Sequence, residues 1–196
     1  MAWGKLGSVT TAATVSDITT GVFTDNKFIT SMNYIDDTPS HNTSGAIRVG
    51  KTTIDTGANY AERVTQDGAA DGTAVNNNYM QLGFDGGNQL MITYGINISG
   101  EEKLFITSLS HQSGAGAGNA PNRREGVGKW VNTSNQYDIY QITAQTGGTR
   151  QISSDSNLSV LGSDAATAMK VQDGAVFYDT DVNKSYVLYN GAWSEL

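Results

Sequence analysis

Short runs in which apolar and polar residues alternate occupy most of the chain, and Gly, Asn, Asp and Ser separate them. A period of two predicts a β-strand, whose successive side chains point to opposite faces. In the run that starts at Phe28, one predicted face carries Ile29 and Ile35, and the other carries Met32 and Tyr34. The runs that we predict as strands are Phe28–Ile35, Asn59–Thr65, Tyr79–Phe84, Leu90–Ile98, Lys103–Ser110 and Tyr137–Thr143.

Helical patterns are nearly absent. The best candidate, Ser163–Val171, begins with a capping serine and contains alanines, but it spans only about two turns. Alternating strands with partly apolar faces are typical of antiparallel sheets that bury one face and leave the other in water. We therefore predict an all-β fold, an antiparallel β-sandwich that is jelly-roll-like.

The predicted chain has two parts. Residues 1–162 form the sandwich, because a β-domain of this length commonly folds as one unit. Residues 163–196 form a small C-terminal hairpin segment, in which Ala175–Asp179 pairs with Lys184–Tyr189. A two-stranded hairpin is marginally stable alone. We therefore expect it to pack on the main domain or on a partner, with Trp193 as the anchor.

One Gly-rich stretch, Gln112–Lys129, interrupts the alternation. A loop of this length inside a compact domain is usually functional or disordered. Two interpretations stay open: a flexible surface excursion, or an ordered arm that contacts a neighbouring subunit. In the second interpretation, Arg123 and Arg124 would pair with acidic groups of that subunit.

Charge and composition limit the classes of function. The formal net charge is −7 and the pI is about 4.6, whereas nucleic-acid binding usually needs a basic stripe that neutralises phosphates. The absence of cysteine removes disulfides, thiolate zinc sites and cysteine nucleophiles. The first residues lack the apolar core of a signal peptide, and no run approaches the roughly 18 apolar residues of a membrane-spanning helix. We expect a soluble protein with no nucleic-acid and no membrane partner.

The segment Gly45–Thr52, with the sequence GAIRVGKT, formally matches the phosphate-binding pattern G-x-x-x-x-G-K-[ST]. That motif works only where a buried strand precedes it and a helix opens at its lysine, here Lys51. The preceding residues are too polar for a buried strand, and the following residues have no helical pattern. We interpret the match as chance, with Ile47 and Val49 as ordinary strand residues.

A second motif resembles the start of a calcium-binding loop. Asp179, Asp181 and Asn183 have the right spacing, but the places that require Gly and Glu hold Lys184 and Asn190. The segment is therefore better interpreted as a hairpin turn.

The remaining polar candidates are sparse. Asp67–Gly72 could bind calcium weakly, although Asp-Gly pairs are ordinary turn residues. His41 and His111 are the only histidines, and neither lies beside a nucleophile motif or can complete a three-histidine zinc site. Glu101 and Glu102 are adjacent rather than facing, and a pair of distant carboxylates stays open. We assign no catalytic, cofactor-binding or metal-binding residue and expect no enzyme and no cofactor.

Aromatic residues leave one alternative function open. Trp3, Trp130 and Trp193, together with nine tyrosines, could stack on sugars. Aromatic side chains of β-sandwiches are more often core and interface residues. A lectin-like module that recognises host-surface glycans is the alternative.

A set of short segments spread over most of the chain carries a family resemblance. These are Ala2–Ser8, Phe23–Phe28, Asp55–Ala61 with Arg63, Glu101–Leu104, Asn119–Arg123, Glu125–Trp130 and Ser156–Asp164. The sequence resembles structural proteins of tailed bacteriophages, particularly marine phages. The ending, Asp173–Asp179 through Asn190–Trp193, is similar to a short hairpin module that recurs in phage tail and fibre proteins.

The resemblance implies a virion component that is assembled in the host cytoplasm, as a capsid decoration protein or in the tail or fibre. It implies contacts with major capsid or tail proteins and transfers no catalytic residue. Closed oligomers are the common way to build such contacts. We therefore expect a homo-oligomer, with a trimer favoured, in which the Gly-rich loop or the C-terminal hairpin lies at the contacts.

Overall fold

The computed structural model describes residues 3–36, 45–83, 87–112, 114–144, 151–164, 174–190 and 192–196. Within those residues the regular secondary structure consists of β-strands alone, and this confirms the predicted all-β class. The strands are β1 (Gly4–Thr10), β2 (Asp17–Thr19), β3 (Phe28–Ile35), β4 (Gly45–Lys51), β5 (Thr53–Ile54), β6 (Tyr60–Gln66), β7 (Gly72–Asn77), β8 (Gln89–Ile96), β9 (Lys103–His111), β10 (Asn122–Trp130), β11 (Ile139–Ala144), β12 (Asn157–Ser163), β13 (Val176–Asp179), β14 (Lys184–Tyr189) and β15 (Ala192–Glu195).

The chain divides into two compact units. The first, Trp3–Asp164, is called the sandwich unit, and the second, Ala165–Leu196, is called the C-terminal unit. The division falls two residues after the boundary drawn from the sequence.

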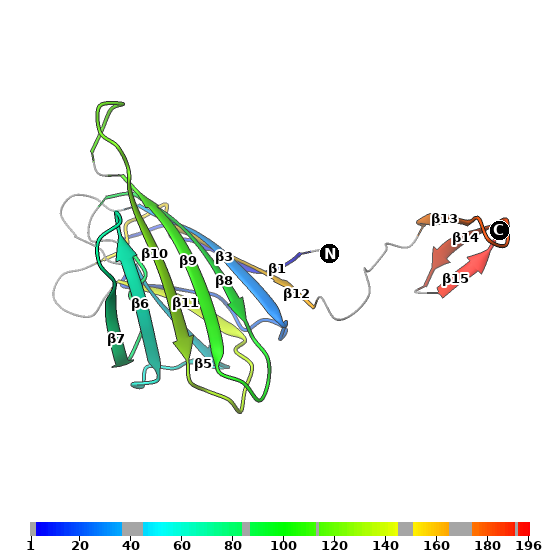
Figure 1. The fold of residues 1–196 in the computed structure, drawn as a ribbon, viewed down its shortest axis with the longest axis horizontal. Coiled ribbons are helices and arrows are strands. Elements are labelled where there is room, and N and C mark those ends of the chain that lie inside the picture. The colour runs from blue at the N-terminus through cyan, green and yellow to red at the C-terminus, as the bar shows by residue number, and fades with distance from the viewer. Residues whose placement is uncertain are drawn as a thin grey trace. The chain divides into compact units, whose positions relative to one another are not determined.

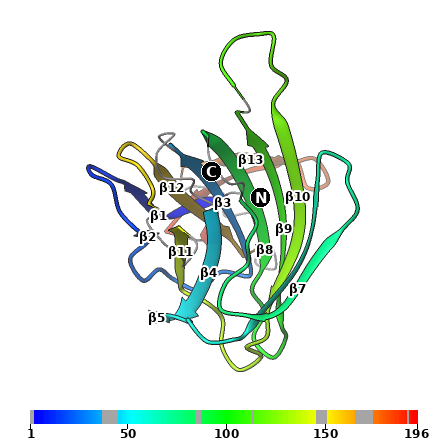
Figure 2. The ribbon, with the colours of Figure 1, turned by 90° about the vertical axis from the view of Figure 1, so that its left-hand side faces the viewer.

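Two antiparallel sheets form the sandwich unit. The large sheet has eight strands in the order β1-β12-β3-β8-β9-β10-β6-β7, and the small sheet has four in the order β2-β11-β4-β5. Figure 1 shows the face of the large sheet, and in Figure 2 the small sheet lies against its other side. The predicted antiparallel sandwich is thus confirmed, while the finer jelly-roll topology stays a prediction.

Alternation along the strands fills the space between the sheets. The large sheet contributes Ile29, Met91 and Phe105, and the small sheet contributes Ile47 and Ile142, all at most 2% exposed. Strands with apolar residues at every second position bury one face when two sheets stack. The face assignment predicted for β3 is correct, because Ile29 and Ile35 point inward.

Buried tyrosines connect the elements of this core. The Tyr60 hydroxyl accepts a hydrogen bond from the Val49 amide at 3.1 Å and lies 2.7 Å from the Val49 carbonyl oxygen, so β6 is tied to β4. The Tyr140 hydroxyl accepts a hydrogen bond of 2.9 Å from the Ser31 hydroxyl. The Tyr137 hydroxyl, in contrast, has no hydrogen-bond partner among the described residues.

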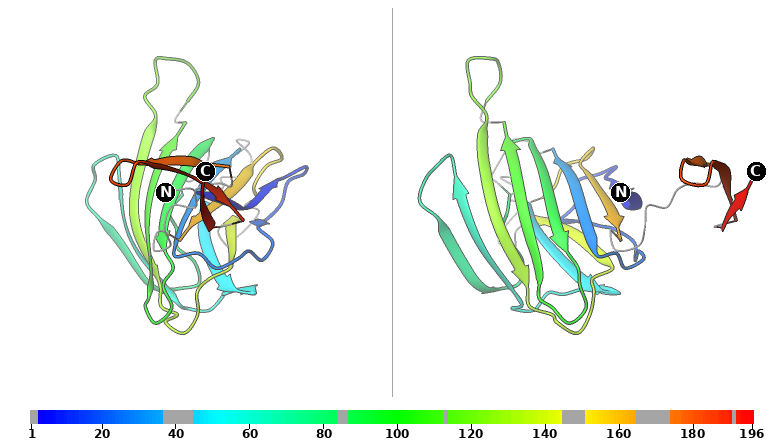
Figure 3. Two further views of the ribbon diagram at one scale, coloured as in Figure 1. Left: turned by 90° about the vertical axis from the view of Figure 1, so that its right-hand side faces the viewer. Right: turned by 45° about the vertical axis from the view of Figure 1, so that its right-hand side comes forward.

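The Gly-rich stretch differs from its prediction. Asn122–Trp130 is not a loop but strand β10, paired on both sides with β9 and β6. A Cβ at Gly126 would lie 2.8 Å from Leu82 Cδ2, and one at Gly128 would lie 2.5 Å from Met80 Sδ. These two glycines therefore serve close packing inside a strand rather than chain flexibility. Only residues 112–121 connect β9 to β10, and this connection extends beyond the end of the sheet (Figure 3).

Other strand predictions differ in detail. The segment predicted over Tyr79–Phe84 makes only an isolated bridge between Met80 and Ile47, and its last residue lies outside the described residues. The strands β1, β2, β7 and β12 had not been predicted. The helix candidate Ser163–Val171 falls mostly outside the described residues.

The C-terminal unit is a small antiparallel sheet in the order β13-β14-β15. It has one strand more than the predicted hairpin, because the chain turns after β14 and pairs Leu188 with Trp193. The Phe177 ring stacks on Tyr186 with 5.4 Å between ring centroids and meets Trp193 edge-on at 5.3 Å. Leu188 is buried, whereas Tyr189 is 70% exposed.

Candidate interaction surface

The outer face of the large sheet, which points away from the small sheet, carries apolar side chains on four neighbouring strands. One row across five strands joins direct neighbours: Thr30 of β3, Tyr94 of β8, Ile106 of β9, Val127 of β10 and Arg63 of β6. Parallel rows above and below it add further apolar side chains. We define the outer apolar band as Met32, Tyr34, Leu90, Tyr94, Leu104, Ile106 and Val127, which are 41–63% exposed.

The band exists because the central strands are apolar on both faces. In β9, Phe105 and Leu109 point into the core, while Leu104 and Ile106 point to the outside. Together these seven large side chains, each about half exposed, leave an apolar area on the order of the largest patch of a typical monomer, which covers about 300–600 Å². Exposed apolar patches of this size are typical of surfaces that contact another molecule.

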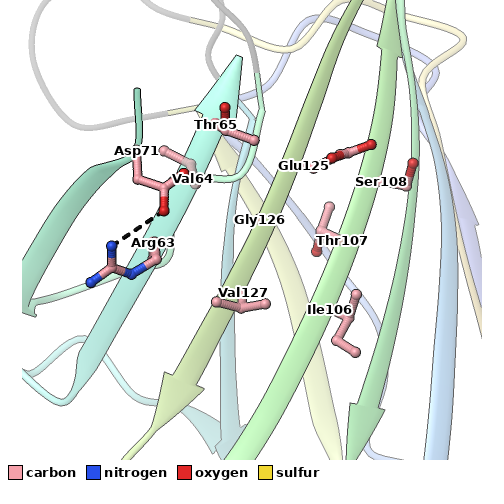
Figure 4. Close-up of a pocket in the computed structure, with 10 residues that line it drawn as sticks. All are labelled: Arg63, Val64, Thr65, Asp71, Ile106, Thr107, Ser108, Glu125, Gly126 and Val127. Atoms are coloured by element: carbon pink, nitrogen blue, oxygen red, sulfur yellow. Dashed lines mark hydrogen bonds and ion pairs between the residues drawn. The ribbon is translucent and has the colours of Figure 1, made fainter. Parts of the chain in front are cut away.

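A hollow of about 400 Å³ lies at the β6 side of the band. Ile106 and Val127 provide its apolar lining (Figure 4). Arg63 and Asp71 form an ion pair of 3.2 Å at its rim, and Glu125 approaches from β10. Such a hollow suits a side chain with an apolar body and a polar tip.

Charges around the outer face are balanced locally. Arg63 pairs with Asp71, and Lys129 pairs with Glu102 at 2.8 Å. These pairs are well exposed, so each contributes little to stability. The pairs matter for the electrostatic potential instead. They keep this face close to neutral, although the whole chain has a net charge of −7.

A second hollow, of about 280 Å³, lies at the end of the band near the β9–β10 connection. Tyr34 and Leu90 line it from β3 and β8, and the amide residues Asn88, Gln112 and Asn119 surround them. An aromatic ring beside several amide groups can hold a ligand that has both apolar and hydroxyl surfaces.

The GAIRVGKT segment forms strand β4 and the turn into β5, so no helix opens at Lys51. The Lys51 Nζ instead lies 3.0 Å from Asp25 Oδ2 and 3.0 Å from Asp138 Oδ2. Hydrogen bonds to Asp25 and Asp138 raise the pKa of Lys51 above its ordinary value. The lysine is thus engaged by two carboxylates, and the segment lacks the geometry of a phosphate-binding loop.

The candidate histidines and carboxylates are dispersed. His41 lies outside the described residues, and His111 is buried at the end of β9. Glu102 pairs with Lys129, while the backbone carbonyl of Glu101 accepts a hydrogen bond from the Lys103 ammonium. The structure therefore does not bring Glu101 and Glu102 together as a facing pair.

Neither calcium candidate forms a cluster of ligands. Asp67 Oδ1 accepts a hydrogen bond from the Arg123 amide at 2.8 Å, and Asp71 is paired with Arg63. The segment around Asp181 is the turn between β13 and β14. Within the described part of the chain, no three His, Asp or Glu side chains gather as a metal site would require.

The three tryptophans have different environments. Trp130 is buried and its indole nitrogen donates a hydrogen bond of 2.7 Å to Asp55 Oδ2. Trp3 and Trp193 are 41% and 43% exposed. Arg124, one of the two arginines expected to pair with a neighbouring subunit, has a partner within its own chain. Its guanidinium donates a hydrogen bond to the Gly83 carbonyl oxygen.

Two carboxyl groups have shifted pKa values that sequence reasoning missed. Burial acts to raise the pKa of Asp55, but hydrogen bonds from Trp130, Gly57 and Asn59 outweigh it and hold that pKa below its ordinary value. Burial also acts on Glu62 and there raises the pKa, against the opposing influence of the Gln81 amide and Arg124. Both are partly buried groups of the sandwich unit that hold its own backbone and side chains in place.

The outer apolar band was also missed, although a signal was present. The prediction for Lys103–Ser110 already placed apolar residues on both faces of the strand, which a strand with one wet face does not need.

No family model, curated protein or solved structure matches the chain. No helix in the described ranges is long and apolar enough to cross a membrane.

Proposed function

We propose that this chain is a non-enzymatic structural component of a phage virion that acts through contacts between subunits. Its place would be the capsid surface, as a decoration protein, or the tail or fibre. The outer apolar band carries the proposal, because an uncovered apolar area of this size on a rigid sheet is suited to protein contact. The resemblance to phage structural proteins supplies the kind of assembly.

The band has the composition of an interface centre. It contains two tyrosines, one methionine and four aliphatic residues, and charged residues lie at its margin. Aromatic residues and methionine are enriched in the centre of protein interfaces, whereas charged residues are depleted there. The strands that carry the band are central in the sheet, so the surface is held rigidly and loses little entropy on binding.

The C-terminal unit offers a second contact. Val176, Tyr178 and Tyr189 are 53–70% exposed, and Leu188 is buried. A segment of roughly 30 residues rarely buries enough apolar area to be stable without a covering surface. We propose that another virion protein, such as a capsid or tail protein, covers it after assembly in the host cytoplasm.

The test uses particles of the phage that encodes the chain. We expect purified particles to contain the chain at a fixed copy number, measured by quantitative mass spectrometry, and antibody labelling to place it in electron micrographs. Phage that encode Ile106→Lys should package less of the chain than phage that encode Val75→Lys, because Val75 is equally exposed but lies on β7, outside the band. Absence of the chain from purified particles would refute the proposal.

Glycan binding is the second candidate function. The hollow beside Tyr34, with its surrounding amide groups, favours it. The wild-type chain would then bind particular host glycans on an array, and Tyr34→Ala would abolish that binding, while Trp3→Ala would serve as a matched aromatic control. An array without signal for the wild-type chain would remove this candidate.

A further inference from the structure

We propose that the outer apolar band is the contact between two copies of this chain, related by a two-fold axis that passes near Ile106. This inference rests on the proposed function, since it names the partner of the same surface. Three properties of the surface support a second copy as the partner: its area, its geometry and its charge.

The area agrees with a dimer contact. Seven large side chains that are each about half exposed leave on the order of several hundred Å² uncovered in each copy, which is the same order as the roughly 800 Å² per partner that a stable interface of standard size buries. Partly buried apolar neighbours, Phe28, Ile92, Ile96 and Leu161, adjoin the band on the same face. Two copies packed face to face would therefore cover the band almost completely.

The geometry of one row is self-complementary. Tyr94 and Val127 are the direct neighbours of Ile106 on opposite sides, each one strand spacing of about 4.8 Å away. A two-fold axis that passes over Ile106 and runs parallel to β9 exchanges the two sides, so Tyr94 of one copy faces the hollow beside Val127 of the other. In such an isologous contact, the same pair forms twice.

The chemistry of the hollow fits a tyrosine from the second copy. The Tyr94 ring is 55% exposed and can pack against Ile106 and Val127 of the other copy. Its hydroxyl then reaches the polar rim, where Asp71 and Glu125 supply acceptors. Tyrosine is favoured at interfaces because it combines a large apolar ring with a polar end.

Charge also favours this face for self-association. Two chains of net charge −7 repel each other in general. On the outer face, however, Arg63 is paired with Asp71 and Lys129 with Glu102, and the formal charges of Arg123 and Glu125 on β10 cancel, so two such faces meet without excess like charge. A second copy can therefore approach here more easily than at a surface with unbalanced acidic groups.

A two-fold arrangement covers both copies of the band at once. A ring of three copies needs two different complementary patches on each subunit, and the band pairs with itself. We therefore infer a dimer at this surface in place of the trimer favoured from the sequence.

The first experiment measures the association of the full-length chain by sedimentation over a range of concentrations. We expect wild type and Val75→Lys to be dimers, and Ile106→Lys to weaken dimerisation at least about a hundredfold, because two lysines would meet at the axis. Circular dichroism checks that both variants fold. A monomeric wild type, a trimer, or equal behaviour of the two variants would overturn the inference.

The second experiment exploits the absence of cysteine from the chain. A residue beside a two-fold axis meets its own copy, so Ile106→Cys should give a covalent dimer with a short bis-maleimide cross-linker, which can span the roughly 10 Å between sheets packed face to face. Val75→Cys, equally exposed but on β7, should remain largely monomeric. Equal cross-linking of both variants, or none in Ile106→Cys, would contradict the two-fold contact.

The two proposals can fail separately. If particles contain the chain but the purified protein is monomeric, the structural role stands and the dimer contact falls. If the purified protein dimerises through Ile106 but never enters particles, the dimer contact stands and the virion role falls.

Discussion

Removing single hydroxyl groups from two buried tyrosines should have opposite consequences for stability. Tyr60 and Tyr137 are both at most 1% exposed and both belong to the same core. The Tyr60 hydroxyl is hydrogen-bonded to both backbone groups of Val49, whereas the Tyr137 hydroxyl has no hydrogen-bond partner among the described residues. The substitutions Tyr60→Phe and Tyr137→Phe delete the same atom from these two environments.

The expected magnitudes follow from the partners left behind. In Tyr60→Phe the buried Val49 amide loses its acceptor, and an unsatisfied buried donor costs about 1–3 kcal/mol. The Val49 carbonyl keeps the amide of Asp55 at 3.0 Å. We expect a loss of about 2 kcal/mol, which lowers the melting temperature of a unit of this size by about 4–8 °C.

Tyr137→Phe removes a hydroxyl that is buried without compensation, and such burial costs about 1–3 kcal/mol. We therefore expect this variant to be as stable as the wild type or more stable by up to about 1 kcal/mol. The exposed Tyr34→Phe is the control and should stay within about 0.5 kcal/mol of the wild type.

Urea unfolding followed by tryptophan fluorescence measures all three variants, because Trp130 is buried in the sandwich unit. The midpoint should shift without a change in slope if only stability has changed. A loss in Tyr137→Phe as large as that in Tyr60→Phe would refute the reasoning from hydrogen-bond partners.

Three further predictions concern groups inside the sandwich unit. Asp55→Asn should make stability less dependent on pH in acid. The folded carboxyl has a lowered pKa, so its ionised form contributes stability above the ordinary pKa, and this contribution is lost as pH falls below about 4. Urea midpoints that fall equally with pH in both proteins would contradict this. Glu62→Gln should be at least as stable as the wild type at neutral pH, and any advantage should shrink on acidification. The reason is that the raised pKa of Glu62 makes its ionised form cost stability above the ordinary pKa. A lower urea midpoint for the variant at neutral pH would argue against this. Gly50→Ala should cost about 3 kcal/mol or more, since its Cβ would overlap the carbonyl oxygen of Thr53, whereas Gly21→Ala has open space; equal melting curves for the two would be the contrary result.

Local periodicity was enough to predict the class of fold and several strands. The prediction for Phe28–Ile35 matches β3 in both bounds and faces, because a period of two is a property of consecutive residues alone. The same approach gave a wrong prediction around Gly126 and Gly128. Glycine commonly signals a loop, but here the close approach of Met80 and Leu82 requires it inside β10, and those neighbours are more than 40 residues away in the chain.

The sequence by itself determined which residues alternate and that the chain lacks cysteine and a basic stripe. Only the tertiary structure decided which apolar face is covered. In β9, alternation made Phe105 and Ile106 equally good core residues, yet the small sheet covers the side of Phe105 and leaves Ile106 63% exposed. The physical reason is that burial depends on what packs against a strand. The register between distant strands joins Tyr94, Ile106 and Val127 into one surface, and no single segment of the sequence determines that register.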